Sequence, residues 1–384
     1  MIASVVIPTH NRIEILKKCL LCMENQTVAH SLFEVIVVDD ASSDGTFEFL
    51  QRYSSTFQFT SFRQTVGDGP AKARNVGILA AQGKIVLLIN DDTLLASDAM
   101  AVHLTVHQEI GQEISVLGRF DLPEYFSAGL WGYVLQHSDI LFRFPALEHN
   151  RLYGGETYWT CNISTPRRAL LAAGLFDERF CGGAWGAEDQ ELGARLLGLN
   201  VPVLFRDDCR AAHEHCLTID GFADMSIARG GGGVILFAKH GMTSHYSQRI
   251  TDADLYFWRN IPSRLDKKVK ELHELLRKTE QIVLPVKDKE APYFTKASFP
   301  DATELAHSLI FMRTRKILEV IESCIKSVEN LLNEVKDDHI GMEDAAKHLY
   351  PVCLIMRYYH DSIGVCSSEA IEVFTKHSER HYAI

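Results

Sequence analysis

The sequence predicts an α/β protein with a mainly parallel central sheet flanked by helices, followed by a C-terminal α-helical region. Short apolar runs alternate with helical segments over about the first 110 residues, and two of these runs end in pairs of aspartates. Beyond about residue 250, long amphipathic helices replace the strand signals. Strands separated by helices form right-handed crossovers, and such crossovers arrange the strands in parallel.

The N-terminal segments follow one another in regular order. The expected strands are Ser4–Ile7, Phe33–Val38, Phe57–Arg63 and Lys84–Ile89, and the expected helices are Ile13–Met23, Thr46–Tyr53 and Ala71–Ala81. Phe33–Val38 is an apolar segment of the kind that is buried on both faces of a parallel sheet. Asn11 is a suitable N-cap for the first helix.

Later segments are less regular. Helices are expected at 166–174 and 187–199 and a strand at 201–205, whereas 112–165 gives no clear assignment. In the C-terminal region a helix face is formed by Leu265, Val269, Leu272 and Leu276. Asp301 and Glu304 form a capping box before a helix that is expected to run to about Val335. We therefore expect two domains, residues 1–250 and 251–384, with a loop or linker at 285–300.

Composition limits the function classes. The 384 residues include 39 Lys plus Arg and 50 Asp plus Glu, a net charge of −11, which argues against a protein that binds nucleic acid with its whole surface. With 46% hydrophobic and 23% charged residues, disordered and fibrous classes are excluded. No apolar run approaches the roughly 20 residues that span a bilayer. The N-terminus is expected to be a strand rather than a signal peptide.

Cysteine usage points to a compartment. Nine scattered cysteines favour reduced thiols over a disulfide framework. We therefore expect a cytoplasmic protein, with peripheral association with the inner face of a membrane as an alternative.

Three strand exits carry polar clusters: Thr9–His10–Asn11, Asp39–Asp40 and Asn90–Asp91–Asp92. In parallel sheets, ligands bind beyond the carboxyl ends of the strands. Acidic oxygens at such a place suit a hard divalent cation, Mn²⁺ or Mg²⁺. For either acidic pair alone, a solvated turn or a helix cap is the simpler explanation, but two pairs at neighbouring strand ends are harder to explain in this way.

Two further segments contain side chains that could act in catalysis or bind a metal. Glu188 and Asp189 begin a helix, whose positive end keeps carboxylates ionised, so one of them could act as a general base; helix capping is the alternative. His213 and His215 alternate in an extended segment and point to the same side, as metal ligands would. A pair of surface or core histidines is the simpler alternative, and a zinc site formed with Cys209 and Cys216 is another.

The order of these pieces is informative. Five motifs, namely Pro8–Arg12, Val37–Thr46, Gly69–Gly77, Asn90–Thr93 and Glu188–Asp189, follow one another at a spacing that resembles the family 2 glycosyltransferases with the GT-A fold. The resemblance covers roughly residues 1–240. It implies an inverting, metal-dependent enzyme.

The resemblance also implies roles for the residues near the donor nucleotide. Pro8, Thr9 and Asn11 would line the base pocket, and Asp40, with Asp39 beside it, would bind the base or ribose of a UDP-sugar. Arg74 and Asn75 would lie near the nucleotide. In the segment that matches the D-x-D motif, Asn90 takes the first place, which leaves Asp92 as the metal ligand and Asp91 as a ribose contact or a partner of the metal ligand.

Roles near the transferred sugar follow from the same resemblance. Trp185–Asp189 is similar to the W-G-G-E-D segment of some relatives, with Asp189 as the catalytic base, Glu188 contacting a sugar and Trp185 stacking on it. His213, rather than His215, would be the second metal ligand. Asn162 would border the donor sugar.

Together these features predict transfer of a hexose or N-acetylhexosamine from a UDP-sugar to a hydroxyl of a glycan, lipid-linked or protein acceptor. The alternative is a catalytically idle nucleotide-sugar-binding or scaffold module that acts through its helical tail. The tail itself is expected to be an accessory element, an oligomerisation element that makes a homo-oligomer, or an acceptor-related one. Gly230–Lys239, with its successive glycines, is expected to be a mobile flap over the acceptor.

Overall fold

The computed structural model describes residues 2–181, 187–240, 252–286, 293–312 and 314–367. The chain divides into two compact units. The first, which we call the sheet unit, comprises residues 1–121 and 147–215, and the second, the helical unit, comprises 122–146 and 216–384. The expected domain boundary near residue 250 lies inside the helical unit. The assignment of 1–250 and 251–384 as domains stays a prediction.

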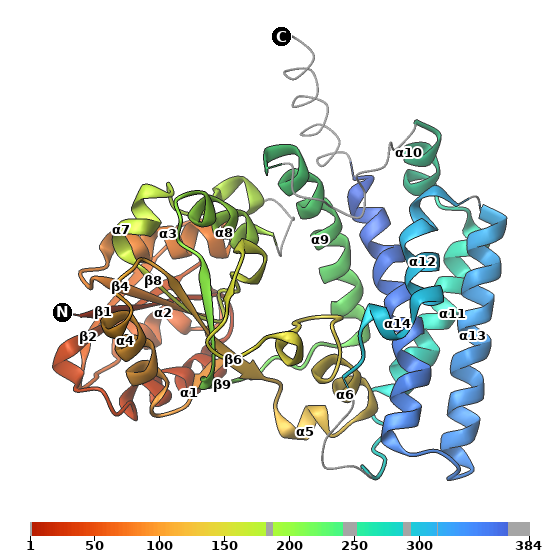
Figure 1. The fold of residues 1–384 in the computed structure, drawn as a ribbon, viewed down its shortest axis with the longest axis horizontal. Helices are drawn as coiled ribbons and strands as arrows, with labels where there is room; N and C mark the ends of the chain where they lie inside the picture. The colour runs from red at the N-terminus through yellow and green to blue at the C-terminus, as the bar shows by residue number, and fades with distance from the viewer. Residues whose placement is uncertain (1, 182–186, 241–251, 287–292, 313, 368–384) are drawn as a thin grey trace. The chain divides into compact units, whose positions relative to one another are not determined.

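A nine-stranded sheet forms the centre of the sheet unit (Figure 1). Its strands are β1 (Ala3–Thr9), β2 (Phe33–Asp39), β3 (Gln58–Arg63), β4 (Ile85–Ile89), β5 (Thr93–Leu95), β6 (Ser115–Asp121), β7 (Leu152–Tyr153), β8 (Asn162–Pro166) and β9 (Val203–His213). They are ordered β3-β2-β1-β4-β8-β6-β9-β5, and β7 pairs with β9. β1 to β4 are mutually parallel, whereas β8 is antiparallel to both β4 and β6.

The strand order reverses at β1. β2 and β3 continue the sheet on one side of β1, and β4 continues it on the other. Every residue of β1 and β2 is buried, as expected for strands that helices cover on both faces. In open α/β sheets, ligands bind outside the carboxyl ends of the strands at such a reversal. The exits of β1 and β4 therefore border the expected ligand crevice.

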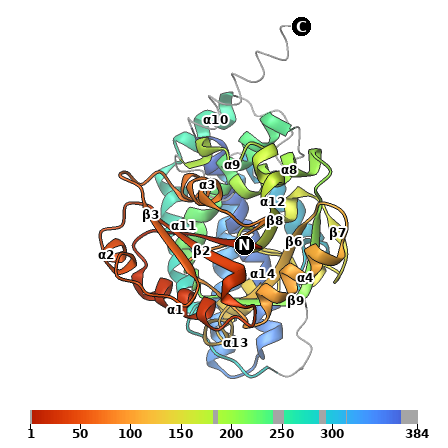
Figure 2. The same ribbon diagram turned by 90° about the vertical axis from the view of Figure 1, so that its left-hand side faces the viewer.

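Helices cover both faces of the sheet, as the sequence predicts. They are α1 (Ile13–Glu24), α2 (Thr46–Leu50), α3 (Pro70–Ala80), α4 (Ala99–Glu109), α7 (Arg167–Ala172) and α8 (Glu188–Gly198). Figures 1 and 2 show α3 and α8 on one side of the sheet and α4 on the other. All of the strands and helices expected before residue 90 begin within one residue of the predicted position. β9 differs most, because pairing with β6 and β5 extends it from the expected end at Phe205 to His213.

The helical unit contains the helices α5 (Glu124–Ser127), α6 (Leu130–Gln136), α9 (Ile219–His240), α10 (Asp252–Arg259), α11 (Ser263–Thr279), α12 (Pro300–Ser308), α13 (Thr314–Lys336) and α14 (Met342–Val365). The predicted apolar face of α11 is buried in a core that also includes α13 and α14. The single helix expected from Asp301 to about Val335 is instead α12 and α13. A 3₁₀ turn at Leu309–Phe311 separates them and buries Leu309 and Ile310.

The glycine-rich segment Gly230–Lys239 lies within α9, so the expectation of a flexible loop there is wrong. A Cβ atom on Gly230 would lie 2.1 Å from the carbonyl oxygen of Asp361, and one on Gly364 would lie 1.8 Å from that of Ile227. These glycines allow the backbones of α9 and α14 to approach closely. Here glycine serves helix packing rather than backbone freedom.

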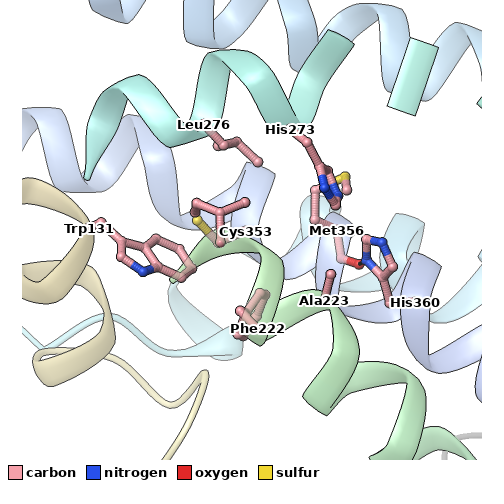
Figure 3. Close-up of a pocket in the computed structure, with 9 residues that line it drawn as sticks. Trp131, Phe222, Ala223, His273, Leu276, Cys353, Met356 and His360 are labelled. Carbon is pink, nitrogen blue, oxygen red and sulfur yellow. Dashed lines mark hydrogen bonds between the residues drawn. The ribbon is translucent and has the colours of Figure 1, made fainter. Parts of the chain in front are cut away.

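A small cavity lies inside the helical unit. Figure 3 shows side chains from α6, α9, α11 and α14 around it. The lining consists of Trp131, Ile219, Phe222, Ala223, His273, Leu276, Cys353, Met356 and His360. Its volume of about 10 Å³ is far below the roughly 300 Å³ of a small-molecule site. Among the described helices, none has both the length and the apolar character to cross a membrane.

Candidate active site

The exits of β1 and β4 form one polar cluster. The hydroxyl of Thr9 donates to Oδ2 of Asp91 at 2.7 Å. Nη1 of Arg12 lies 3.2 Å from Oδ1 of Asp91 and 2.6 Å from Oδ2 of Asp92. Both carboxylates are buried, whereas the side chain of Arg12 is 42% exposed. A partly solvated guanidinium therefore offsets part of the negative charge of two buried acids.

Asp92 also faces both histidines of the segment after β9. His213 pairs with Thr93 of β5, which brings the end of β9 beside Asp92. Oδ1 of Asp92 lies 3.2 Å from Nε2 of His213, and Oδ2 lies 3.3 Å from Nδ1 of His215. One ligand atom from each of these three side chains lies within 4.8 Å of the other two. The structure thus brings both candidate histidines to the predicted metal ligand, not His213 alone.

These donors fit a divalent cation. Oδ1 of Asp92 is buried and accepts no hydrogen bond of good geometry, so an oxygen lone pair is available there. A carboxylate oxygen together with two imidazole nitrogens suits Mn²⁺ better than Mg²⁺, which prefers oxygen ligands.

The groups around Asp91 and Asp92 shift the pKa values of these two acids in opposite directions. Burial alone would raise the pKa of Asp92, but the imidazoles of His213 and His215 and the charge of Arg12 hold it well below its usual range. Burial, together with repulsion from Asp92, raises the pKa of Asp91 to about 6. Asp92 is therefore the acid that stays ionised and available to a cation.

The other acidic pair, at the exit of β2, has different partners. Oδ1 of Asp40 accepts from the backbone N–H of Asp68 at 2.9 Å, and Oδ2 accepts from that of Gly69 at 2.8 Å. Oδ1 of Asp39 accepts from the backbone N–H of Ser42 at 3.1 Å. This pair fixes the loops that follow β2 and β3.

Arg74 connects the exit of β4 with the start of α8. Its Nη2 donates to Oδ1 of Asn90 at 2.9 Å, and its Nη1 donates to Oε1 of Glu188 at 3.3 Å. Nδ2 of Asn90 lies 3.3 Å from Sγ of Cys161, which in turn lies 3.9 Å from Nε2 of His213. This chain of contacts links the candidate base helix to the metal-ligating cluster.

Asp189 is the second residue of α8 and is partly buried. Its Oδ1 accepts from the backbone N–H of Gln190 at 2.7 Å. Burial, followed by repulsion from Glu188, raises the pKa of Asp189 to about 7, against the opposing effect of Arg74. A carboxylate with a pKa near neutrality is suited to proton transfer.

Two predicted site residues form hydrogen bonds within the protein. Nδ2 of Asn75 donates to the carbonyl of Phe176 at 3.0 Å, and its Oδ1 accepts from the N–H of the same residue at 2.9 Å. Asn162 is fully buried, with Oδ1 2.9 Å from Nε2 of His103 and Nδ2 3.1 Å from the carbonyl of Cys209. The prediction that Asn162 borders the donor sugar does not fit this placement, because its amide is engaged in the core.

Pro8 and Asn11, which were predicted to line the base pocket, lie in β1 and directly after it. Pro8 is buried within β1. Asn11 is exposed, has a positive φ of 53° and accepts from the backbone N–H of Ser43 at 2.7 Å. It does not cap α1, whose N-cap position is Arg12. Trp185 lies outside the described residues.

The roles of Arg12 and Asn90 were not foreseen. The signal for Arg12 was a basic side chain directly after a strand exit, opposite an unbalanced acidic pair. For Asn90, the signal was an asparagine at the position where the D-x-D motif has its first aspartate. Unlike a carboxylate, its amide can donate to Cys161 and accept from Arg74 at the same time.

The sequence model of the family described as Glycosyl transferase family 2 matches residues 4–160. That span includes the exits of β1, β2 and β4 and ends before α8 and His213.

Curated relatives are glycosyltransferases by name. The chain is 29% identical over 234 residues to validoxylamine A glucosyltransferase of Streptomyces hygroscopicus subsp. jinggangensis, which covers 52% of this chain and 52% of that protein. It is 28% identical over 268 residues to the uncharacterized glycosyltransferase YfnE of Bacillus subtilis, covering 57% and 67%. The match thus spans about half the length of the first relative.

One solved structure supports the fold. Mannosyltransferase PcManGT from Pyrobaculum calidifontis, in complex with GDP-Man and Mn²⁺, gives a TM-score of 0.50 at 16% identity, over 92% of this chain and 85% of that one. The chain has the predicted α/β fold of the GT-A type with a helical C-terminal region.

Proposed function

Residues 4–160 belong to glycosyl transferase family 2, and from this premise we propose that the protein is an inverting, metal-dependent glycosyltransferase. It moves a hexose or N-acetylhexosamine from a UDP-sugar to a hydroxyl of a glycan, lipid-linked or protein acceptor. The observation that carries the proposal is the cluster of Asp92, His213 and His215 at the exit of β4. Arg74 and Asn90 connect this cluster to the helix that begins with Glu188 and Asp189.

The exit of β2 offers a hydrogen-bond acceptor that suits a uracil base. Oδ2 of Asp39 is buried, has no hydrogen-bond partner among the described residues and lies 3.5 Å from Nε of Arg63. Both oxygens of Asp40 already accept backbone N–H groups. Asp39 is therefore the better acceptor for the imide N–H of uracil, and Asp40 shapes the loop around it.

Asp92, His213 and His215 would hold Mn²⁺ or Mg²⁺, with Mn²⁺ favoured by the two imidazoles. When bound, the cation supplies Lewis-acid stabilisation of the diphosphate that leaves the sugar. Arg12, which forms ion pairs with Asp91 and Asp92 at the same strand exit, would supply a positive charge for phosphate oxygens.

Asp189 acts as the general base. Its ionised carboxylate accepts the proton of the acceptor hydroxyl while the hydroxyl oxygen forms a bond to the anomeric carbon. The bond between that carbon and the diphosphate oxygen breaks on the opposite face, so one displacement inverts the configuration. Glu188, paired with Arg74, holds the start of α8 in position beside the reacting groups.

The decisive experiment measures UDP release from a panel of UDP-sugars with Mn²⁺, with and without Asp189→Asn. The variant should lose transfer by a factor of about 10² to 10⁴, the usual contribution of a general base, and should bind UDP as the wild type does. Wild-type turnover by Asp189→Asn would remove Asp189 from the role of base. Absence of UDP release from every donor, in a protein that binds UDP, would favour the idle nucleotide-sugar-binding module.

A further inference from the structure

The helical unit contains a second group of charges, far in sequence from the strand exits. It consists of Arg229 of α9, Lys296 of the 3₁₀ turn Lys296–Ser298, Arg357 and Asp361 of α14, and Asp139 after α6. The ammonium of Lys296 is within electrostatic range of the other four groups. Three cations and two carboxylates leave an excess of one positive charge, and the acid-rich chain as a whole makes such a local excess unusual.

Both carboxylates of this group are engaged. Oδ1 of Asp139 accepts from the hydroxyl of Tyr350 at 2.7 Å, and Oδ2 accepts from the backbone N–H of Lys296 at 3.2 Å. Oδ1 of Asp361 pairs with Nη2 of Arg229 at 3.1 Å. Little anionic capacity remains for the side chains of Lys296 and Arg357.

Three hydrogen-bond donors in this part of the helical unit have no hydrogen-bond acceptor among the described residues. Among the described residues, Lys296 forms no ion pair, and its Nζ lies 5.6 Å from the ring centre of Tyr358. Nε of Arg357 is buried without a hydrogen-bond partner, and the oxygen Oδ2 of Asp361 lies 3.9 Å from it. The hydroxyl of Tyr293, also buried without a partner, is within electrostatic range of Asp139.

Such donors are costly in a folded protein. A buried polar group without a partner destabilises the fold, and an unpaired charge destabilises it more. Burial, and then the charge of Arg357, lowers the pKa of Lys296 to about 8, against the opposing effect of Asp139 and Asp361. Arg357 itself is fixed, because its Nη1 donates to the carbonyl of Ile140 at 2.8 Å.

We propose that Lys296, Arg357 and Tyr293 form a binding site for a phosphate group in the helical unit. A phosphate offers several acceptor oxygens and so can satisfy three donors, whereas a carboxylate offers two oxygens in one plane. Lys296 is only partly buried, which leaves an approach for the ligand. All three residues belong to the helical unit, and the proposal does not depend on the transferase activity.

Isothermal titration of the full chain with inorganic phosphate, in EDTA and without nucleotide, tests the proposal. The wild type should bind phosphate saturably. Lys296→Gln should weaken binding by about tenfold or more, as loss of a charged hydrogen bond implies, and Tyr293→Phe by about fivefold. Lys347→Gln is the matched control, because it removes the same charge from an exposed pair with Asp344 in the same unit and should bind as the wild type does.

Thermal melting gives a second readout that a purely structural role would not produce. Without phosphate, Tyr293→Phe should melt no lower than the wild type, because it removes a buried hydroxyl that has no partner. With phosphate, it should gain less stability than the wild type. Absence of saturable phosphate binding by the wild type, or equal binding by Lys296→Gln and Lys347→Gln, would overturn the proposal.

The phosphate could be soluble or part of a lipid headgroup, and vesicle sedimentation distinguishes the two. The experiment compares sedimentation of the protein with phosphatidylcholine vesicles that contain phosphatidic acid and with vesicles that lack it. Sedimentation that requires both phosphatidic acid and Lys296 assigns the site to a headgroup. Binding of inorganic phosphate without such sedimentation assigns it to a soluble phosphate compound.

Discussion

The exits of β2 and β4 carry the same pair of residues but hold them differently. At β2, fixed backbone N–H groups donate to Asp39 and Asp40. At β4, side-chain cations and imidazoles surround Asp92. Backbone donors cannot leave without unfolding the loop, whereas side chains can rotate away from a carboxylate. The exit of β2 is therefore held by its loops, whereas the exit of β4 is held by side chains that a cation would replace.

Asp92→Asn should produce the largest effect. Removing the charged ligand should lower the transfer rate by about 10³-fold, several kcal/mol of lost charge stabilisation, and should abolish Mn²⁺ binding. Electron paramagnetic resonance of free Mn²⁺ measures the binding directly. If Asp92→Asn retained Mn²⁺ affinity, the cation would have to bind elsewhere, and the comparison of the two acidic pairs would fail.

His215→Gln should have the next largest effect. It removes one of two imidazoles, and we expect a 10- to 100-fold weaker Mn²⁺ affinity, the usual range for tuning of a metal site. His149→Gln, which replaces an exposed histidine elsewhere on the sheet unit, is the matched control. Unchanged affinity of His215→Gln would leave His213 as the single imidazole ligand.

Asp189 extends the comparison to a further acid, one whose pKa is raised and not lowered. Because burial and Glu188 raise its pKa to about 7, the ionised base and therefore kcat/KM should fall about tenfold per pH unit below that value and level off above it. Glu188→Gln removes the repulsion and should move this limb to lower pH. An unmoved limb in Glu188→Gln would assign the titration to another group.

Asp40→Asn should have the smallest effect, and on stability rather than on the metal. The amide replaces one acceptor oxygen for the N–H groups of Asp68 and Gly69, at a cost of about 1–3 kcal/mol. Thermal melting should show the loss, while Mn²⁺ affinity stays that of the wild type. A large loss of Mn²⁺ affinity would mean that the exit of β2 helps to hold the cation.

Much of the sheet unit could be predicted because its signals are local. Strands such as β2 are continuously buried, so their composition alone identifies them. The extension of β9 to His213 could not be predicted, because it depends on pairing with β5 and β6. The break between α12 and α13 likewise depends on the burial of Leu309 and Ile310 in the core of the helical unit.

In the candidate site, too, some features could be predicted from local sequence and others could not. Motif order made Asp92, Asp189 and His213 candidates, and the structure brings Asp92 and His213 together at one edge of the sheet. Asn162 belongs to a motif of similar appearance, yet its side chain turns into the core toward His103. Side-chain direction near the end of a strand depends on the neighbouring strands, which the sequence does not specify locally.

The sequence by itself therefore determined the α/β class, the acidic strand exits and the resemblance to glycosyl transferase family 2, since each rests on residue type and spacing along the chain. Only the tertiary structure decided which acids are held by backbone and which by exchangeable side chains, that His215 joins His213, and that glycines of α9 pack against α14. The physical reason is that hydrogen-bond saturation and burial are properties of neighbours in space. For Asp40, Asp92 and Gly230, those neighbours lie tens to more than a hundred residues away.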